Sequence, residues 1–127
     1  MKEVVVDTNF LLLPYQFKVD IFGELQYLIE EPFQIVISSK VVGELKSLAK
    51  RIGKAGAGAR VALKLLDFRK QDVKSISSGA PVDDWVFEYS IANRSMVCTN
   101  DLALKDRLKK ARIRVIGLRG RTKIGYV

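Results

Sequence analysis

The sequence predicts an α/β fold, a three-layer α/β/α sandwich in which a central parallel sheet of about five strands lies between helices. Short β-branched runs alternate along the chain with segments whose apolar residues recur at helical spacing. The runs are continuously apolar, as is typical of strands that are buried on both faces. With 127 residues, 48% of them hydrophobic, we expect one domain over residues 1–127.

The first half of the chain is expected to hold two strands and two helices. The strands are residues 4–6 and 35–37, and the helices are residues 21–29 and 41–49. Ser38 and Ser39 offer an N-cap for the second helix. Residues 51–60 contain three glycines, each of which costs a helix about 1 kcal/mol relative to alanine. We therefore expect a mobile connection there.

The second half continues the alternation with three further helices and three further strands. The helices are expected over residues 61–66, 81–92 and 102–111, and the strands over residues 73–76, 96–98 and 115–116. Pro81 suits the first turn of a helix. The tail, residues 119–127, is basic and predicts no element.

The charge balance favours a polyanionic partner. Lys and Arg number 22 against 14 Asp and Glu, which gives a net charge of +8, and nucleic acid is the expected partner. No apolar run reaches the roughly 18 residues of a membrane span, and the N-terminus has too short an apolar run for a signal peptide. The single cysteine, Cys98, lies in an apolar stretch, so we expect a cytoplasmic protein with no membrane association.

Four acidic residues lie just after predicted strands or on the helices that follow them: Asp7, Glu44, Asp83 and Asp101. The carboxyl ends of parallel strands meet at one edge of a sheet, so these side chains are expected to converge. Clustered carboxylates repel one another unless a cation lies between them. The chain has no histidine, and carboxylates alone suit Mg²⁺ or Mn²⁺ better than zinc. Each acid also has a structural explanation, as a cap, a turn residue or a solvated helix residue.

Four short segments resemble the motifs of the PIN-domain nucleases, a family of metal-dependent ribonucleases that includes the VapC-type toxins. They are residues 5–9 (VVDTN), residues 42–45 (VGEL), Asp83 with Val86, and residues 97–101 (VCTND). The resemblance implies that Asp7, Glu44, Asp83 and Asp101 hold Mg²⁺ or Mn²⁺. It also implies endonucleolytic hydrolysis of RNA phosphodiester bonds.

The substrate and the partners remain open at this point. Residues 9–20 are similar to the opening of the PIN nucleases that process small-subunit ribosomal RNA in eukaryotes, and to their archaeal relatives. The resemblance therefore allows a toxin or an RNA-processing nuclease, with an antitoxin or a ribosome-assembly partner, and a homodimer. The alternative is a non-catalytic RNA-binding or ribosome-assembly factor that shares the fold.

Neighbouring residues are expected to support the acids. Thr8, Asn9 and Thr99 are candidates for orienting carboxylates or water, although Thr99 could equally cap a helix. Asp83 and Asp84 are adjacent, so only one can face the site; the distance to Asp101 in VapC-like sequences favours Asp83 and leaves Asp84 beside the site or exposed. Basic residues near the glycine-rich segment are candidates for RNA binding: Lys46, Lys50, Arg51, Lys54 and Arg60.

Overall fold

Strand β1 (Lys2–Val6) lies in the middle of a six-stranded sheet with the order β3-β2-β1-β4-β5-β6. The computed structural model describes residues 1–127. The first five strands are mutually parallel, and β6 pairs antiparallel with β5. The remaining strands are β2 (Phe33–Ser38), β3 (Val73–Ile76), β4 (Met96–Cys98), β5 (Val115–Arg119) and β6 (Lys123–Tyr126).

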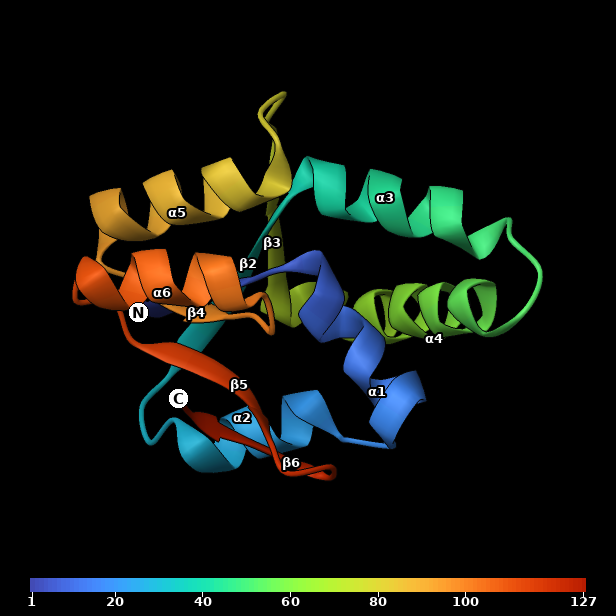
Figure 1. Ribbon diagram of the computed structural model, residues 1–127, viewed down its shortest axis with the longest axis horizontal. Helices are drawn as coiled ribbons and strands as arrows, with labels where there is room; N and C mark the ends of the chain where they lie inside the picture. Colours follow the sequence, from blue (N-terminus) through green and yellow to red (C-terminus); the bar gives the residue numbers. More distant parts are fainter.

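Helices cover both faces of this sheet and complete the predicted three-layer α/β/α arrangement (Figure 1). One face carries α5 (Val82–Asn93) and α6 (Leu102–Lys110). The other face carries α1 (Leu13–Phe17), α2 (Ile21–Leu28), α3 (Ser39–Ala49) and α4 (Lys54–Phe68). Two short 3-10 turns, η1 (Thr8–Leu12) and η2 (Lys70–Asp72), complete the chain.

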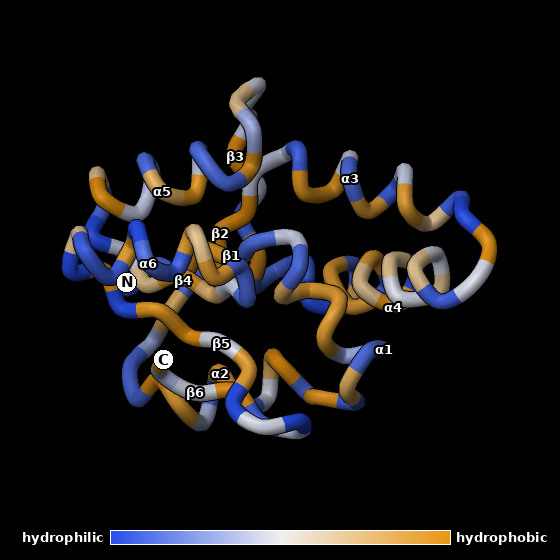
Figure 2. Tube along the Cα trace, in the orientation of Figure 1, coloured by the Kyte–Doolittle hydropathy of each residue, from blue (hydrophilic) through white to orange (hydrophobic).

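The alternation of side chains along each strand divides the core into two parts. Val4 and Val6 pack with the helices α1 to α4, whereas Val5 packs with α5 and α6. All three side chains are buried, which explains why β1 reads as a continuous apolar run. Figure 2 shows that α3 is hydrophobic on the side facing α4 and hydrophilic on the opposite side.

The sheet has one strand more than expected, because part of the basic tail forms β6. Gly120, with a φ of 70°, lies at the turn between β5 and β6. On β6, Ile124 is buried and its backbone N–H donates a 2.9 Å hydrogen bond to the carboxylate of Glu24 on α2. The pairing partner, β5, directly precedes β6, whereas the anchor, Glu24, lies 100 residues away, and the local sequence of the tail does not reveal it.

The expected mobile connection over residues 51–60 is wrong, because α4 begins at Lys54. Gly56 and Gly58 are buried inside this helix. A Cβ atom at Gly56 would collide with the backbone carbonyl of Arg51, so the glycine allows the chain to turn back closely after α3. Tertiary packing of α4 against α3 and α1 outweighs the low helix propensity of the glycines.

The order of the strands determines where the predicted acidic site lies. Strands β2 and β4 flank β1, and the helices that follow β1 (α1 and α2) and β4 (α6) pack on opposite faces of the sheet, which creates a crevice at the carboxyl ends of these strands. The parallel register pairs Val6 with Cys98, so the next residues, Asp7 and Thr99, emerge side by side. No helix combines the length and the apolar character needed to cross a membrane.

Candidate active site

A cleft of about 970 Å³ lies at the carboxyl edge of the sheet, and all four predicted acids line it. Asp7 follows β1 and Asp101 follows β4, while Glu44 comes from α3 and Asp83 from the first turn of α5. The cleft is also lined by Thr8, Asn9, Leu12, Lys40, Gly43, Ser47, Leu48, Arg51, Pro81 and Val82. Residues more than 90 positions apart in the sequence therefore share one surface.

Asp7 is the most buried of the four acids, with 6% of its surface exposed. One carboxylate oxygen accepts a 2.9 Å hydrogen bond from the backbone N–H of Thr8. The other oxygen accepts hydrogen bonds from the hydroxyl of Thr99 at 2.8 Å and from the amide of Asn9 at 3.3 Å. Both oxygens are thus held in fixed positions, which keeps the carboxylate aligned at the edge of the cleft.

Burial raises the pKa of Asp7 above its ordinary value, because the charged form loses water. The hydrogen bonds from Thr99 and Thr8 oppose this rise, and the nearby negative charges of Asp101 and Glu44 add to it. Asp7 therefore interacts electrostatically with two other acids of the cleft. Burial thus penalises the ionised form of Asp7, and a cation bound beside it would lessen that penalty.

Glu44 and Asp101 are each held by hydrogen bonds to neighbouring groups. The hydroxyl of Thr8 donates a 2.7 Å hydrogen bond to Glu44 Oε1 and links η1 to α3. Asp101 is the N-cap of α6: its Oδ1 accepts from the N–H of Leu104 at 3.0 Å, and its own N–H donates to the hydroxyl of Thr99 at 3.1 Å. Thr99 thus contacts both the carboxylate of Asp7 and the backbone of Asp101, while the cap of α6 is Asp101 itself.

The structure separates the two adjacent acids of α5. Asp83 lines the cleft, and its Oδ1 accepts a 3.0 Å hydrogen bond from the N–H of Asp84. Asp84 is not among the residues that line the cleft; its carboxylate lies 3.7 Å from the guanidinium of Arg107 on α6. The helical register therefore brings Asp83 and not Asp84 to the other three acids.

Comparison with known proteins identifies the family of the chain. Residues 4–121 match the family model described as "PIN like domain". The chain belongs to the PIN-like domain family. The resemblance noted in the sequence is thereby confirmed.

Relatives of this PIN-like domain include proteins named for action on RNA. The chain is 30% identical over 121 residues to "Ribonuclease VapC4" of Methanocaldococcus jannaschii, which covers 94% of this chain and 92% of that protein. It is 31% identical over 110 residues to "rRNA-processing protein FCF1" of Saccharomyces cerevisiae, and there it spans only 54% of the relative. Among solved structures, "Structure of the PIN domain endonuclease Utp24" superimposes with a TM-score of 0.76 at 25% identity, covering 98% of this chain and 90% of that one.

The basic residues expected to bind RNA lie in different surroundings in this PIN-like domain. Arg51 lines the cleft. The guanidinium of Arg60 instead donates hydrogen bonds to the carbonyls of Ala49 at 2.8 Å and Arg51 at 3.4 Å, where it caps the end of α3. The other three candidates are exposed but do not line the cleft: Lys46, Lys50 and Lys54.

Three residues of the cleft region were not singled out from the sequence. Lys40 and Ser47 lie four residues before and three residues after Glu44, so helical spacing from Glu44 could have found them. Asn100 accepts a 3.0 Å hydrogen bond from the N–H of Leu118 on β5, and its own N–H donates to the side-chain oxygen of Asn9 at 3.1 Å. This pair joins η1, the segment after β4 and strand β5 at the carboxyl edge, and no local pattern predicts it.

The donor set of the cleft fits a hard divalent cation. Its side-chain ligands are carboxylate, hydroxyl and amide oxygens, and the only thiol of the chain, Cys98, is fully buried with its pKa raised by burial. The acids are spread over the cleft, and no group of three or more is gathered closely enough to form a metal cluster by itself. Mg²⁺ commonly retains several waters and takes only one or two carboxylates directly, so it would not require three acids in one cluster.

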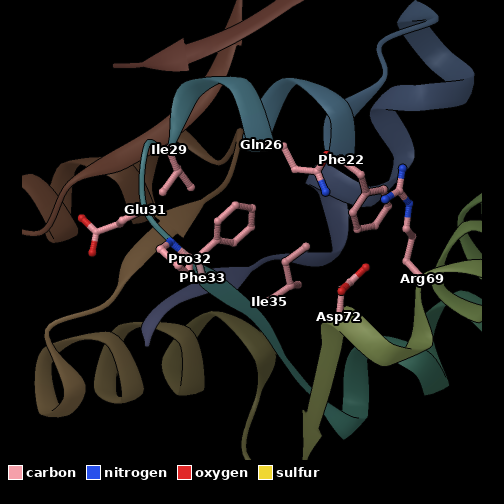
Figure 3. A pocket seen from close by; sticks show the side chains of 9 residues that line it. All are labelled: Phe22, Gln26, Ile29, Glu31, Pro32, Phe33, Ile35, Arg69 and Asp72. Carbon is pink, nitrogen blue, oxygen red and sulfur yellow. The ribbon is translucent and has the colours of Figure 1, made fainter.

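A second cavity, of about 300 Å³, has different chemistry (Figure 3). Phe22, Phe33 and Ile35 form its apolar part, and charged side chains such as Arg69 and Asp72 lie around them. The guanidinium of Arg69 lies 5.6 Å from the ring centre of Phe22. None of the four acids lines this cavity. The cleft at the carboxyl edge is therefore the candidate active site of the PIN-like domain.

Proposed function

We propose that the protein is a divalent-metal-dependent endoribonuclease that hydrolyses RNA phosphodiester bonds. The observation that carries this proposal is the shared cleft of Asp7, Glu44, Asp83 and Asp101 at the carboxyl edge of a PIN-like domain. The relatives named as ribonucleases, and the solved neighbour named as an endonuclease, support the reaction class.

In the proposed reaction the four acids hold one or two Mg²⁺ or Mn²⁺ ions, directly or through water. When bound, the metal lowers the pKa of a water molecule and offsets the charge that grows on the phosphate. The hydrogen bonds from Thr99 and Asn9 fix the position of Asp7 Oδ2, and the one from Thr8 fixes that of Glu44 Oε1. These bonds reduce the reorganisation that the carboxylates would otherwise undergo during catalysis.

No side chain in the cleft offers an alternative general base or nucleophile with an ordinary pKa near neutrality. The chain contains no histidine. Cys98 is fully buried in β4, and burial raises the pKa of its thiol, so it stays protonated. Water activated in the carboxylate cleft is accordingly the proposed nucleophile.

RNA is the proposed partner, and the net charge of +8 favours its approach. The relatives include both VapC ribonucleases and rRNA-processing proteins at 30–31% identity. A toxin role, with an antitoxin as partner, and an RNA-processing role, with an assembly partner, therefore both stay proposals, as does a homodimer. The cytoplasm is the proposed compartment, in keeping with a single free cysteine.

The test is cleavage of a structured RNA by the wild-type protein and by Asp7→Asn, with Mn²⁺ and with chelator. We expect cleavage only by the wild-type protein in Mn²⁺, because Asn keeps the size of the side chain and removes the charge that holds the ion. If both proteins bind RNA equally and neither cuts, the protein is a non-catalytic RNA-binding or ribosome-assembly factor instead.

A further inference from the structure

The side of α3 that faces the cleft carries a single row of residues at helical spacing. Residues 40, 43, 44, 47 and 48 line the cleft at spacings that place them on one face of α3, and Arg51, just past the end of this helix at Ala49, lines the cleft too. At 1.5 Å per residue, the helical part of the row, from Lys40 to Leu48, is about 12 Å long, and Arg51 lies beyond it. The row therefore extends well beyond Glu44 in both directions.

Charges along this row alternate in sign. Lys40 lies at its start, Glu44 in its middle and Arg51 at its end, and all three side chains are exposed. The one ion pair in the structure joins Arg107 to Asp84, so neither Lys40 nor Arg51 is neutralised by a protein carboxylate. Two unpaired cations on either side of an acid suit a chain of successive phosphates. The cations would contact the outer phosphates, and the central phosphate would lie at the acid that is proposed to bind metal.

Gly43, beside Glu44 on this row, has no packing reason to be a glycine. A Cβ atom placed on it would have nothing within 4 Å, whereas a Cβ on the helical glycines Gly23 and Gly56 would collide with neighbouring atoms. Glycine inside a helix is less favourable than alanine, so the fold alone would favour a side chain here. Space kept free on the wall of a cleft suits the close approach of a ligand to the helix backbone.

We propose that this face of α3 is a binding track for the backbone of single-stranded RNA. Gly43 leaves the space in which one sugar–phosphate unit lies against the helix beside Glu44, and Lys40 and Arg51 contact the phosphates on either side of that unit. The inference rests on the proposed nuclease function and deepens it. It assigns a path to the substrate. Gly43 is then a positioning residue, because its lack of a side chain leaves room for the RNA backbone.

The first test fills the space at Gly43. Gly43→Ala should raise Tm by roughly 4 °C, because alanine favours the helix. In the Asp7→Asn background, where RNA is bound without being cut, the same change should weaken binding of a short fluorescent RNA roughly tenfold. Gly43→Gln, which is also a good helix former, should weaken it further. A stabilised protein that binds RNA less well is a result that loss of folding cannot produce.

The second test removes the flanking cations. Lys40→Gln and Arg51→Gln should each weaken RNA binding several-fold and reduce the slope of log K against log salt by about 0.7, the value for one contact to a single strand. The matched control is Lys110→Gln on α6. Lys110 lies in the last turn of that helix, away from the cleft, and its loss should leave the slope unchanged.

The outcomes separate the track from the nuclease function. The track is wrong if Gly43→Ala leaves RNA binding unchanged in the Asp7→Asn background and leaves cleavage unchanged in the wild-type background. It is also wrong if the slopes of log K against log salt agree for Lys40→Gln and Lys110→Gln. Either result would count against the track even where cleavage by the wild-type protein is established. If no RNA is cut by the wild-type protein, the nuclease proposal fails. Binding losses confined to Gly43, Lys40 and Arg51 would then still support the track.

Discussion

The hydroxyl of Thr99 donates a 2.8 Å hydrogen bond to Asp7 Oδ2 across a separation of 92 residues in the sequence. Thr99→Val keeps the shape of the side chain and removes this donor. We expect a 10–100-fold loss of cleavage rate, the range found when the group that orients a metal ligand is removed. Because the bond lowers the pKa of Asp7, its loss should also shift the acid limb of the pH–rate profile to higher pH.

Thr99→Ser is the matched control, since it restores the hydroxyl. Its cleavage rate and pH profile should stay close to those of the wild-type protein. A Thr99→Val variant with a reduced rate but an unchanged acid limb would assign Thr99 to support of α6, through its bond to the N–H of Asp101, and not to Asp7.

Asp7→Asn is expected to stabilise the metal-free protein at neutral pH. Burial raises the folded-state pKa of Asp7 above its unfolded value, so ionised Asp7 costs stability above that pKa, and the cost disappears as the pH falls through it. With chelator present, Tm of the variant should exceed that of the wild-type protein at pH 7. Thermal melts at decreasing pH should show this gap closing, and a gap that widens on acidification would contradict the raised pKa.

The same electrostatics predicts stabilisation by metal. An ion that binds only the folded state at one hundred times its Kd adds about 2.7 kcal/mol, or roughly 10 °C in Tm. Mn²⁺ should raise Tm of the wild-type protein and leave that of an Asp7→Asn, Asp101→Asn double variant unchanged. Asp106→Asn, on the exposed side of α6, is the control and should retain the full shift.

The layers and most of the strands could be predicted from the sequence, because continuous apolar runs and helical stripes are local patterns. Two errors have a common cause. Residues 51–60 contain glycines that read as a break, but Gly56 meets a backbone carbonyl from before the helix, and this contact is set by the packing of α4 on α3. Strand β6 likewise depends on pairing with β5 and on Glu24, which lies 100 residues away.

The convergence of the acids followed from a general property of parallel sheets, but the partners of each acid did not. That Asp7 and Thr99 would be neighbours depends on β1 lying beside β4, an order that spacing along the chain does not give. The basic residues predicted to bind RNA show that closeness along the chain can also mislead. Proximity to the glycine-rich segment suggested Arg60, which caps α3, while helical spacing from Glu44 would have selected Lys40.

The two adjacent acids of α5 provide the last prediction. Asp83 lines the cleft and Asp84 faces Arg107 at 3.7 Å, in an exposed pair of the kind that contributes about 0–1 kcal/mol to stability. Asp83→Asn should therefore reduce the cleavage rate roughly 100-fold, because it removes a proposed metal ligand, and should leave Tm without metal almost unchanged.

Asp84→Asn makes the same chemical change one position along the same turn and is the matched control. Its cleavage rate should stay within about threefold of the wild-type rate, and its Tm should fall by no more than a few degrees. Single-turnover cleavage and thermal melts of the two variants, side by side, provide the comparison. The helix register permits only one of these carboxylates to reach the other acids. Equal losses of cleavage in both variants would mean that α5 turns in solution and that the cleft is not formed as the structure has it.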